Sequence, residues 1–257
     1  MKEAASGVVM LEVSTDVMGS PRIICPTIIK DGSAVVLVDT GFPGQSALAA
    51  LREALHEAGV SLDRIRAVII THQDLDHIGG LPGLVEETRG GAEVLAHAAE
   101  APYIQGEKRL LKFPPQAATG TDSLPEEAHK AMQQVFENPP RAKVTRTVED
   151  GEELPYGGGT VIIHTPGHTP GHLCLYVKQA KVLIAGDALN IEEGRLIGPR
   201  PQFTADMDSA LRSLKKLARY DIESVICYHG GLYSGDANQR IAGLAKGGSA
   251  EMPTRQG

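Results

Sequence analysis

The feature that most constrains this chain is the segment Thr-His-Gln-Asp-Leu-Asp-His-Ile-Gly-Gly at residues 71–80. It follows the apolar run 67–70, which is typical of a buried strand. Two imidazoles and two carboxylates therefore leave the end of one strand together: His72, Asp74, Asp76 and His77. Nitrogen and oxygen donors of this kind bind zinc and its neighbours in the first transition row. Taken alone, the segment is also compatible with a solvated, charged turn.

The same arrangement of apolar run, ligand-capable side chain and glycine occurs three more times, within residues 162–172, 184–187 and 226–231. Each time an aliphatic or β-branched run gives way to a loop, as at the end of a strand. These segments contribute three further candidate donors: His168, Asp187 and His229. Four such strand ends in one chain favour a metal site much more strongly than any one of them.

These motifs resemble those of the metallo-β-lactamase-fold hydrolases, and the likeness extends from about Val8 to Lys246. The family signature is His-x-His-x-Asp-His, then a His after Thr-Pro-Gly, then Gly-Asp, then a late His. Asp39-Thr40-Gly41 matches the early Asp-Thr-Gly turn of the same family. The resemblance implies an α/β (α+β) fold, a four-layer αββα sandwich, formed by a single domain over residues 1–246.

The resemblance also implies two divalent metal ions at one edge of the sheets, with zinc expected first and Mn or Fe as alternatives. Carried over position by position, it implies these ligands: His72 and His168 in the first site, Asp76, His77 and His229 in the second, and Asp187 bridging both.

Asp74 is a departure from the family pattern, because it stands where the family has its second His. The flanking residues keep their spacing, so this is a substitution in place. A carboxylate can complete the first site, and it is a harder donor than imidazole that favours Mn or Fe(II) somewhat more. Alternatively Asp74 does not reach the metal and the chain holds one ion tightly. The sequence leaves both alternatives open.

A carboxylate-bridged metal pair predicts a hydrolase. Such a site lowers the pKa of bound water and presents hydroxide to a carbonyl group, and Asp76 is the expected catalytic residue that orients it or moves its proton. No Gly-x-Ser-x-Gly nucleophile motif is evident. We therefore expect lactonase-like hydrolysis of small esters, lactones or thioesters. Two alternatives remain: a persulfide-dioxygenase-like enzyme with one iron on His72, His168 and Asp187, and a non-catalytic metal-binding protein.

The composition limits the classes of molecule that this chain is expected to bind. A net charge of −7 provides no basic footprint for nucleic acid or an anionic membrane, so the expected partner is a small-molecule substrate. The chain begins without an apolar leader and has no run long enough for a membrane span, which predicts a cytoplasmic protein. The cysteines are expected to be reduced and buried: Cys25, Cys174 and Cys227. The oligomeric state is not predictable.

The order of elements follows from hydrophobic periodicity. Strands are expected at 8–13, 23–29, 34–38, 93–96, 143–148, 160–164, 173–177, 181–185 and 224–227. Helices are expected at 45–58, 81–87, 126–136, 207–219 and 237–246.

Between the two halves lies the Pro-rich stretch 98–141, predicted to form a helical cap over the metal cleft. Its aromatics Tyr103, Phe113 and Phe136 are either pocket walls or packing between cap and body. The polar tail 247–257 is expected to be disordered.

Several residues are expected to support the site. Asp39 suits a carboxylate that orients a ligand imidazole. His164 and His172 are predicted to be hydrogen-bonded supports, and His97 is predicted to cap or pack. His56 and His129 are expected on helix surfaces.

Overall fold

The computed structural model describes residues 1–17, 20–112 and 126–246. Its larger sheet has seven strands in the order β1 (Lys2–Ala5), β2 (Val8–Met10), β5 (Thr27–Asp31), β6 (Ala34–Val38), β7 (Ile65–Ile69), β8 (Glu93–His97) and β9 (Arg146–Val148). The second sheet has six strands in the order β10 (Glu153–Leu154), β11 (Thr160–His164), β12 (Leu173–Val177), β13 (Val182–Ile184), β16 (Ser224–Cys227) and β17 (Gly231–Ser234). Two hairpins pair β3 (Val13–Val17) with β4 (Ser20–Ile24), and β14 (Asn190–Glu192) with β15 (Arg195–Ile197).

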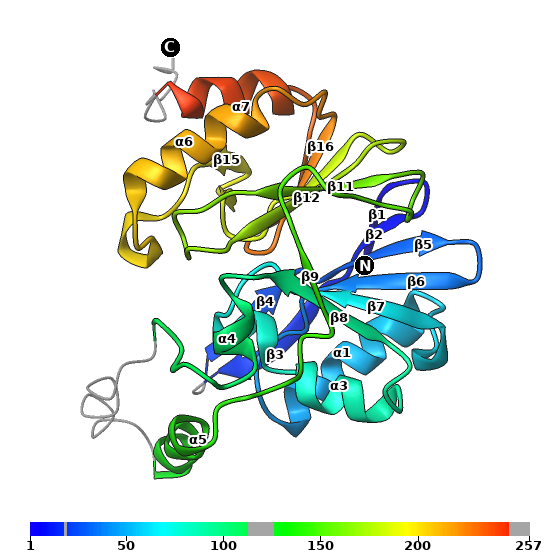
Figure 1. The fold of residues 1–257 in the computed structure, drawn as a ribbon, viewed down its shortest axis with the longest axis vertical. Helices are drawn as coiled ribbons and strands as arrows, with labels where there is room; N and C mark the ends of the chain where they lie inside the picture. The colour runs from blue at the N-terminus through cyan, green and yellow to red at the C-terminus, as the bar shows by residue number, and fades with distance from the viewer. Residues whose placement is uncertain (18–19, 113–125, 247–257) are drawn as a thin grey trace, which may run out of the picture.

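Helices cover the outer face of each sheet (Figure 1). The larger sheet carries α1 (Gln45–Glu57), α2 (Leu75–Ile78) and α3 (Leu81–Glu87), and the second sheet carries α6 (Met207–Leu217) and α7 (Ala237–Ala245). The remaining helices are α4 (Ala101–Ile104) and α5 (Glu126–Glu137). The four-layer αββα order expected from the motifs is confirmed. No helix in the described ranges is long and apolar enough to cross a bilayer.

The layered arrangement of sheets and helices arises because the two faces of a central strand pack in different cores. β6 is buried throughout its Val35–Val38 run because successive side chains point to opposite faces and both faces are covered. Val35 and Leu37 pack with Leu51 of α1 in the helix-side core. Val36 and Val38 pack instead in the core between the two sheets, which the second sheet's strands complete. A third core joins the second sheet to α6 and α7.

Strand direction explains why functional side chains gather at one edge. β6, β7, β8 and β9 run parallel, as do β13 and β16. Parallel strands place their carboxyl ends at the same edge of a sheet. The loops that follow β6, β7, β13 and β16 therefore start close together, and they carry the Asp-Thr-Gly turn and three of the ligand motifs.

Two predicted strands are divided in the structure. Residues 8–13 split at Leu11-Glu12, because β2 pairs with β5 in the larger sheet whereas β3 pairs with β4 in a separate hairpin. Residues 23–29 split at Cys25-Pro26, where proline has no N–H to donate to a ladder. The expected strand 143–148 is shortened to β9. Five strands were not predicted: β1, β10, β14, β15 and β17.

The stretch 98–141 contains α4 and α5, and Figure 1 shows α5 lying apart from both sheets. Tyr103 packs against the helix-side core, and with Phe136 it lines a cavity of about 210 Å³ that contains none of the candidate donors. The packing interpretation is therefore supported for Tyr103, whereas the role of Phe136 stays a prediction. Phe113 and the tail 247–257 lie outside the described residues. The role of this stretch in substrate access stays a prediction.

Candidate metal centre

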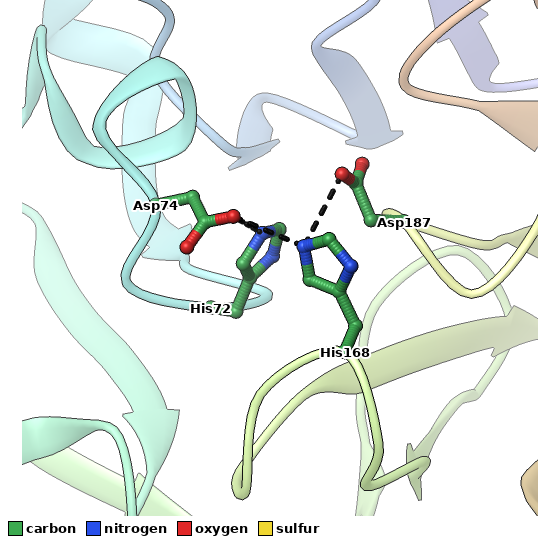
Figure 2. Close-up of side chains that lie close together, drawn as sticks. All are labelled: His72, Asp74, His168 and Asp187. Atoms are coloured by element: carbon green, nitrogen blue, oxygen red, sulfur yellow. Dashed lines mark hydrogen bonds and ion pairs between the residues drawn. The ribbon is translucent and has the colours of Figure 1, made fainter. Parts of the chain in front are cut away.

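The first donor set lies where the loops after β7, β11 and β13 meet (Figure 2). Nε2 of His168 is 3.0 Å from Oδ2 of Asp74 and 3.4 Å from Oδ2 of Asp187. Nε2 of His72 is 3.3 Å from Oδ2 of Asp74. One ligand atom from each of these four residues lies within 4.8 Å of the others. The carboxylate at position 74 thus lies among the donors.

The second donor set comprises Asp76, His77 and His229. Oδ2 of Asp76 lies 3.2 Å from Nε2 of His229 and 4.0 Å from Nε2 of His77. Asp187 stands between the two sets: its Oδ1 is 3.4 Å from Nε2 of His77 and 3.6 Å from Nε2 of His229, whereas its Oδ2 faces His168. The seven predicted donors are therefore brought together around one carboxylate.

Buried atoms without partners indicate that these donors fit a metal. Three buried atoms have no hydrogen-bond partner among the described residues: Nε2 of His72, Nε2 of His77 and Oδ1 of Asp187. A buried polar atom left unpaired costs about 1–3 kcal/mol. All three atoms point into the donor cluster, where a divalent cation would satisfy them. Imidazole nitrogen and carboxylate oxygen are the donors that such a cation uses.

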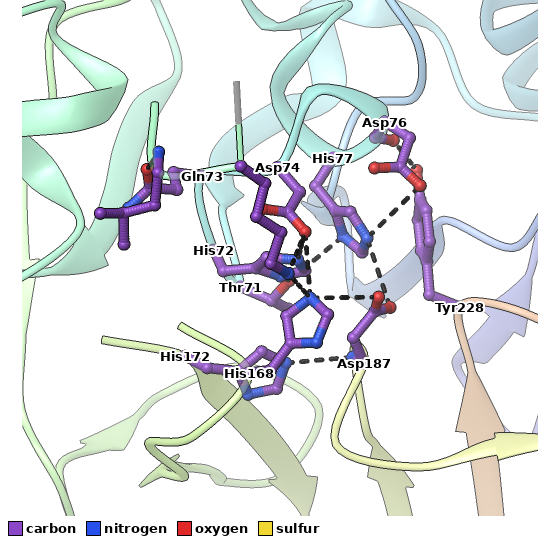
Figure 3. Close-up of polar contacts among 12 residues, drawn as sticks. Thr71, His72, Gln73, Asp74, Asp76, His77, His168, His172, Asp187 and Tyr228 are labelled. Atoms are coloured by element: carbon purple, nitrogen blue, oxygen red, sulfur yellow. Dashed lines mark hydrogen bonds and ion pairs between the residues drawn. The ribbon is translucent and has the colours of Figure 1, made fainter. Parts of the chain in front are cut away.

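The tautomers of His72 and His77 follow from their partners. Oδ2 of the buried Asp39 lies 2.8 Å from Nδ1 of His77, and an ionised carboxylate can only accept, so Nδ1 carries the proton. Thr71 Oγ1 donates to the same Oδ2 at 2.8 Å, which leaves its oxygen to accept from Nδ1 of His72 at 3.0 Å. In its neutral form each ring therefore carries its lone pair on Nε2, which faces the cluster. The contact predicted for Asp39 with a candidate ligand imidazole is therefore present. Figure 3 shows His77 and His168 both facing Asp187.

His172 supports the site and is not a donor to it. Its Nε2 accepts the N–H of Asp187 at 3.0 Å, and its Nδ1 lies 2.8 Å from Thr165 Oγ1. Burial holds its pKa well below the ordinary value, so the ring is neutral and both nitrogens are committed. Gly186 leaves room for this ring, because a Cβ there would lie 2.7 Å from Nε2 of His172. The supporting role expected for His172 is confirmed.

Glu100 was not recognised in the sequence, yet it ties three segments together. Its fully buried carboxylate accepts from the backbone N–H of Gln73 at 2.9 Å, from Nε2 of Gln73 at 3.0 Å and from the N–H of Gly171 at 2.7 Å. The loop that carries His72 and the loop that carries His168 are thereby fixed to the end of β8. In the sequence Glu100 is an acidic residue that follows His97-Ala98-Ala99, and such a position does not by itself indicate a functional role.

Tyr228 was also missed as a functional residue. Its ring packs on His77 with 3.8 Å between centroids, and its hydroxyl donates to the backbone oxygen of Asp76 at 2.5 Å. The residue is buried directly before His229. Tyr228 therefore contacts both His77 and Asp76 of the second donor set, and Asp39 binds Nδ1 of the same His77.

The charges of the site oppose the effect of burial. Burial would raise the pKa values of Asp74 and Asp187, but the facing imidazoles hold both well below the ordinary carboxyl value. Burial would likewise lower the pKa of His77, but surrounding carboxylates raise it well above its usual range, and they raise the pKa of His229. Burial lowers the pKa of His168. The carboxylates are thus ionised, and the protons held on His77 and His229 are ones that a bound cation would replace.

A cleft of about 610 Å³ opens onto the donors. Its floor includes Asp76, Asp187 and His229, and its walls carry two arginines, Arg22 and Arg200. Apolar side chains complete the walls: Ile23, Ile24, Phe42 and Phe203. The cleft is therefore wide enough for a small organic molecule, with cationic and apolar surfaces above the donors.

The remaining histidines and the cysteines have structural positions. Nδ1 of His97 accepts the N–H of Ala99 at 3.2 Å, and its ring stacks on His164 with 4.0 Å between centroids. Nε2 of His164 lies 2.9 Å from the backbone oxygen of Pro170. His56 is exposed on α1, and the side chain of His129 lies outside the described residues. As expected, three cysteines are buried and unpaired: Cys25, Cys174 and Cys227.

Known proteins resemble this chain across most of its length. Residues 24–229 match the sequence profile of the metallo-beta-lactamase superfamily. The probable metallo-hydrolase YflN of Bacillus subtilis (strain 168) is 32% identical over 212 residues, which cover 76% of this chain and 75% of YflN. The crystal structure of the metallo-beta-lactamase family protein TTHA1429 from Thermus thermophilus matches with a TM-score of 0.70 and 25% identity, covering 94% of this chain and 79% of that one. ST1585 from Sulfolobus tokodaii matches at a TM-score of 0.64 and 21% identity, over 94% of this chain and 85% of that one, and shows the fold alone.

Proposed function

The chain belongs to the metallo-beta-lactamase superfamily, and from this premise we propose that it is a metal-dependent hydrolase of small esters, lactones or thioesters. The observation that carries the proposal is the convergence of three buried atoms without a hydrogen-bond partner among the described residues, on His72, His77 and Asp187, in a donor cluster whose Asp187 lines an open cleft. Similarity to a probable metallo-hydrolase supports the same reaction class.

The residues that would hold the metal are those of the two donor sets: His72, Asp74 and His168, then Asp76, His77 and His229, with Asp187 shared. Two divalent ions fit this division, with zinc favoured by four imidazoles and Mn or Fe(II) accommodated by the carboxylate of Asp74. A divalent ion in such a site polarises a carbonyl oxygen and makes water a nucleophile near neutral pH.

Asp76 is the residue we assign to proton handling. Its carboxylate lines the cleft with 21% of the side chain exposed, so substrate and water can reach it. Burial would raise its pKa, but His77 and His229 lower it overall, which keeps the carboxylate ionised and able to accept a proton. Asp76 would orient the attacking water, take up its proton and deliver that proton to the leaving group.

The cleft walls favour a substrate with an acidic group and an apolar part. Arg200 Nη2 pairs with Glu192 at 2.9 Å, but its Nε is buried and has no partner among the described residues. The structure records no ion pair for Arg22 within the described ranges, so its charge is available to a ligand. Ile23 and Phe203 are large apolar side chains left 63% and 52% exposed beside these cations. Guanidinium groups bind carboxylates in bidentate fashion, and the apolar side chains would cover the rest of the molecule.

The test is hydrolysis by chelator-treated protein reloaded with zinc, manganese or iron. Esters, lactones and thioesters are compared, each with and without a carboxylate. We expect hydrolysis that chelator abolishes and metal restores, and a loss of about 100-fold or more in kcat in Asp76→Asn. His56→Ala, on the exposed face of α1, is the matched control and should remain active. If one bound iron supports sulfur-dependent oxygen uptake and no hydrolysis occurs, the protein is an oxygenase and the proposal is wrong.

A further inference from the structure

A lysine from outside all of the ligand motifs reaches into the first donor set. Nζ of Lys112 donates to Oδ2 of Asp74 at 2.6 Å and lies 2.5 Å from Nε2 of His168. Because an ammonium group can only donate, Nε2 of His168 is the acceptor. The ammonium therefore uses the lone pairs of two atoms that a metal would also need.

The position of Lys112 is built into the fold. The N–H of the preceding Leu111 donates to Oε1 of Gln73 at 2.8 Å, and Gln73 is itself held by the buried Glu100. Leu110 is buried in the helix-side core. These contacts fix the backbone before Lys112 next to the first donor set, where the Lys112 side chain is only 29% exposed.

The lysine faces Asp74, the position in the His-x-His-x-Asp-His motif at which this chain departs from the family pattern. Asp74 adds a second carboxylate to the first donor set, next to Asp187. A buried anion needs a compensating cation, and Lys112 provides one at hydrogen-bond distance. The second set has no such partner, because no lysine or arginine in the described ranges forms a recorded ion pair with Asp76 or Asp187.

We propose that Lys112 is a tethered cation that holds the first donor set until a metal ion displaces it, so that the two sets load in a fixed order. The second set, built on Asp76, His77 and His229, binds its ion first and tightly. The first set binds an ion only when the ammonium moves away from Asp74 and His168, since the two cations need the same atoms. This inference rests on the metal binding in the proposed function, but it concerns affinity and order and not hydrolysis.

Calorimetric titration of chelator-treated, full-length protein with zinc tests the order. The wild type should bind one ion tightly and a second ion at least about tenfold more weakly, whereas Lys112→Met should tighten the weaker step by about tenfold or more and leave the tighter step unchanged. This is the scale of the effect that one adjacent unit charge has on an ionisation. The matched control is Lys108→Met on the same segment, whose Nζ lies 5.5 Å above the Tyr103 ring and touches no donor. It should behave like the wild type.

Lys112→Arg keeps the charge and should keep the second step weak, which separates loss of the cation from a loss of local structure. Indistinguishable isotherms for the wild type and Lys112→Met would overturn the inference, as would tightening of the first step alone. If zinc binds in the expected order but no ester, lactone or thioester is hydrolysed, the proposed function fails and this inference stands.

Discussion

Oδ2 of Asp39 lies 2.8 Å from Nδ1 of His77, and in the neutral ring this contact leaves the lone pair on Nε2, which faces the donor cluster. Asp39 adopts a φ of 62°, a left-handed conformation that Asn adopts at least as readily as Asp. Asp39→Asn should therefore fold, but its amide N–H would point at Nδ1 and favour the tautomer with the proton on Nε2. We expect metal affinity to fall by about 10–100-fold.

Chelator competition measures that affinity. The control is Asp208→Asn, at an exposed carboxylate in the first turn of α6, which should bind metal like the wild type. Equal affinity in Asp39→Asn and the wild type would mean that Asp39 does not orient His77.

The metal-free protein should be most stable near pH 6.5, the ordinary pKa of histidine. His77 and His229 have raised pKa values, so above pH 6.5 the folded state keeps protons that the unfolded chain has lost, and stability falls as pH rises. The lowered pKa of His172 acts in the opposite direction: below pH 6.5 the unfolded chain binds a proton that the folded state does not, and stability falls as pH drops. Bound zinc should remove the alkaline fall because it replaces the protons.

Urea unfolding from about pH 5 to about pH 8, with chelator and with zinc, measures this dependence. A midpoint in chelator that keeps rising toward the alkaline end would contradict the raised pKa values of His77 and His229.

Glu100→Gln should destabilise the protein by about 1–3 kcal/mol, because the amide N–H group that replaces one oxygen confronts backbone and side-chain N–H donors in a buried place. Glu107→Gln is the matched control. Within the described ranges the Glu107 carboxylate accepts only from Gln105 Nε2, at 3.2 Å on the surface, and the change should stay within about 0.5 kcal/mol. The free energy of unfolding in urea is the measurement. Equal values for the two variants would show that the Glu100 contacts contribute little.

Gly79→Ala should also destabilise strongly. A Cβ at Gly79 would lie 2.1 Å from the backbone N of Pro43 and 2.2 Å from the backbone C of Phe42, and neither backbone atom can move aside cheaply. Overpacking of this kind costs about 1–3 kcal/mol or more. Gly243→Ala in α7 meets no atom within 4 Å and should stabilise by up to about 1 kcal/mol. Thermal unfolding of both variants tests the contrast, and a neutral Gly79→Ala would show that the loop 42–43 can shift.

Much of the fold was predictable because its central strands are buried on both faces. The apolar runs that form β6 and β7 have no other stable position, and α1 ends as predicted before Gly59, which has a φ of 68°. The short strands β1, β14 and β15 were not predictable, because strand formation at an edge depends on its pairing partner more than on local preference. The same reason explains why residues 8–13 divide between two sheets.

The donor positions were predictable because each lies at the end of an apolar run with a glycine near it. Glu100, Tyr228 and Lys112 were not, since their roles come from contacts with residues far away in sequence: Glu100 with Gly171, Tyr228 with Asp76, and Lys112 with His168. No local pattern distinguishes Lys112 from the neighbouring Lys108. Only the path of the chain brings one of them to the donors.

The donors are divided between the two sheets, and this division has a consequence for biosynthesis. The larger sheet supplies the motif after β7, but three donors belong to the later half of the chain: His168, Asp187 and His229. When a ribosome has synthesised the strands of the larger sheet, it has therefore synthesised only part of either donor set. Complete donor sets for the proposed ions exist only after the second sheet has docked, and a bound ion would link the two halves at the edge where they meet. In a metal-starved cell, the newly made protein would lack this link.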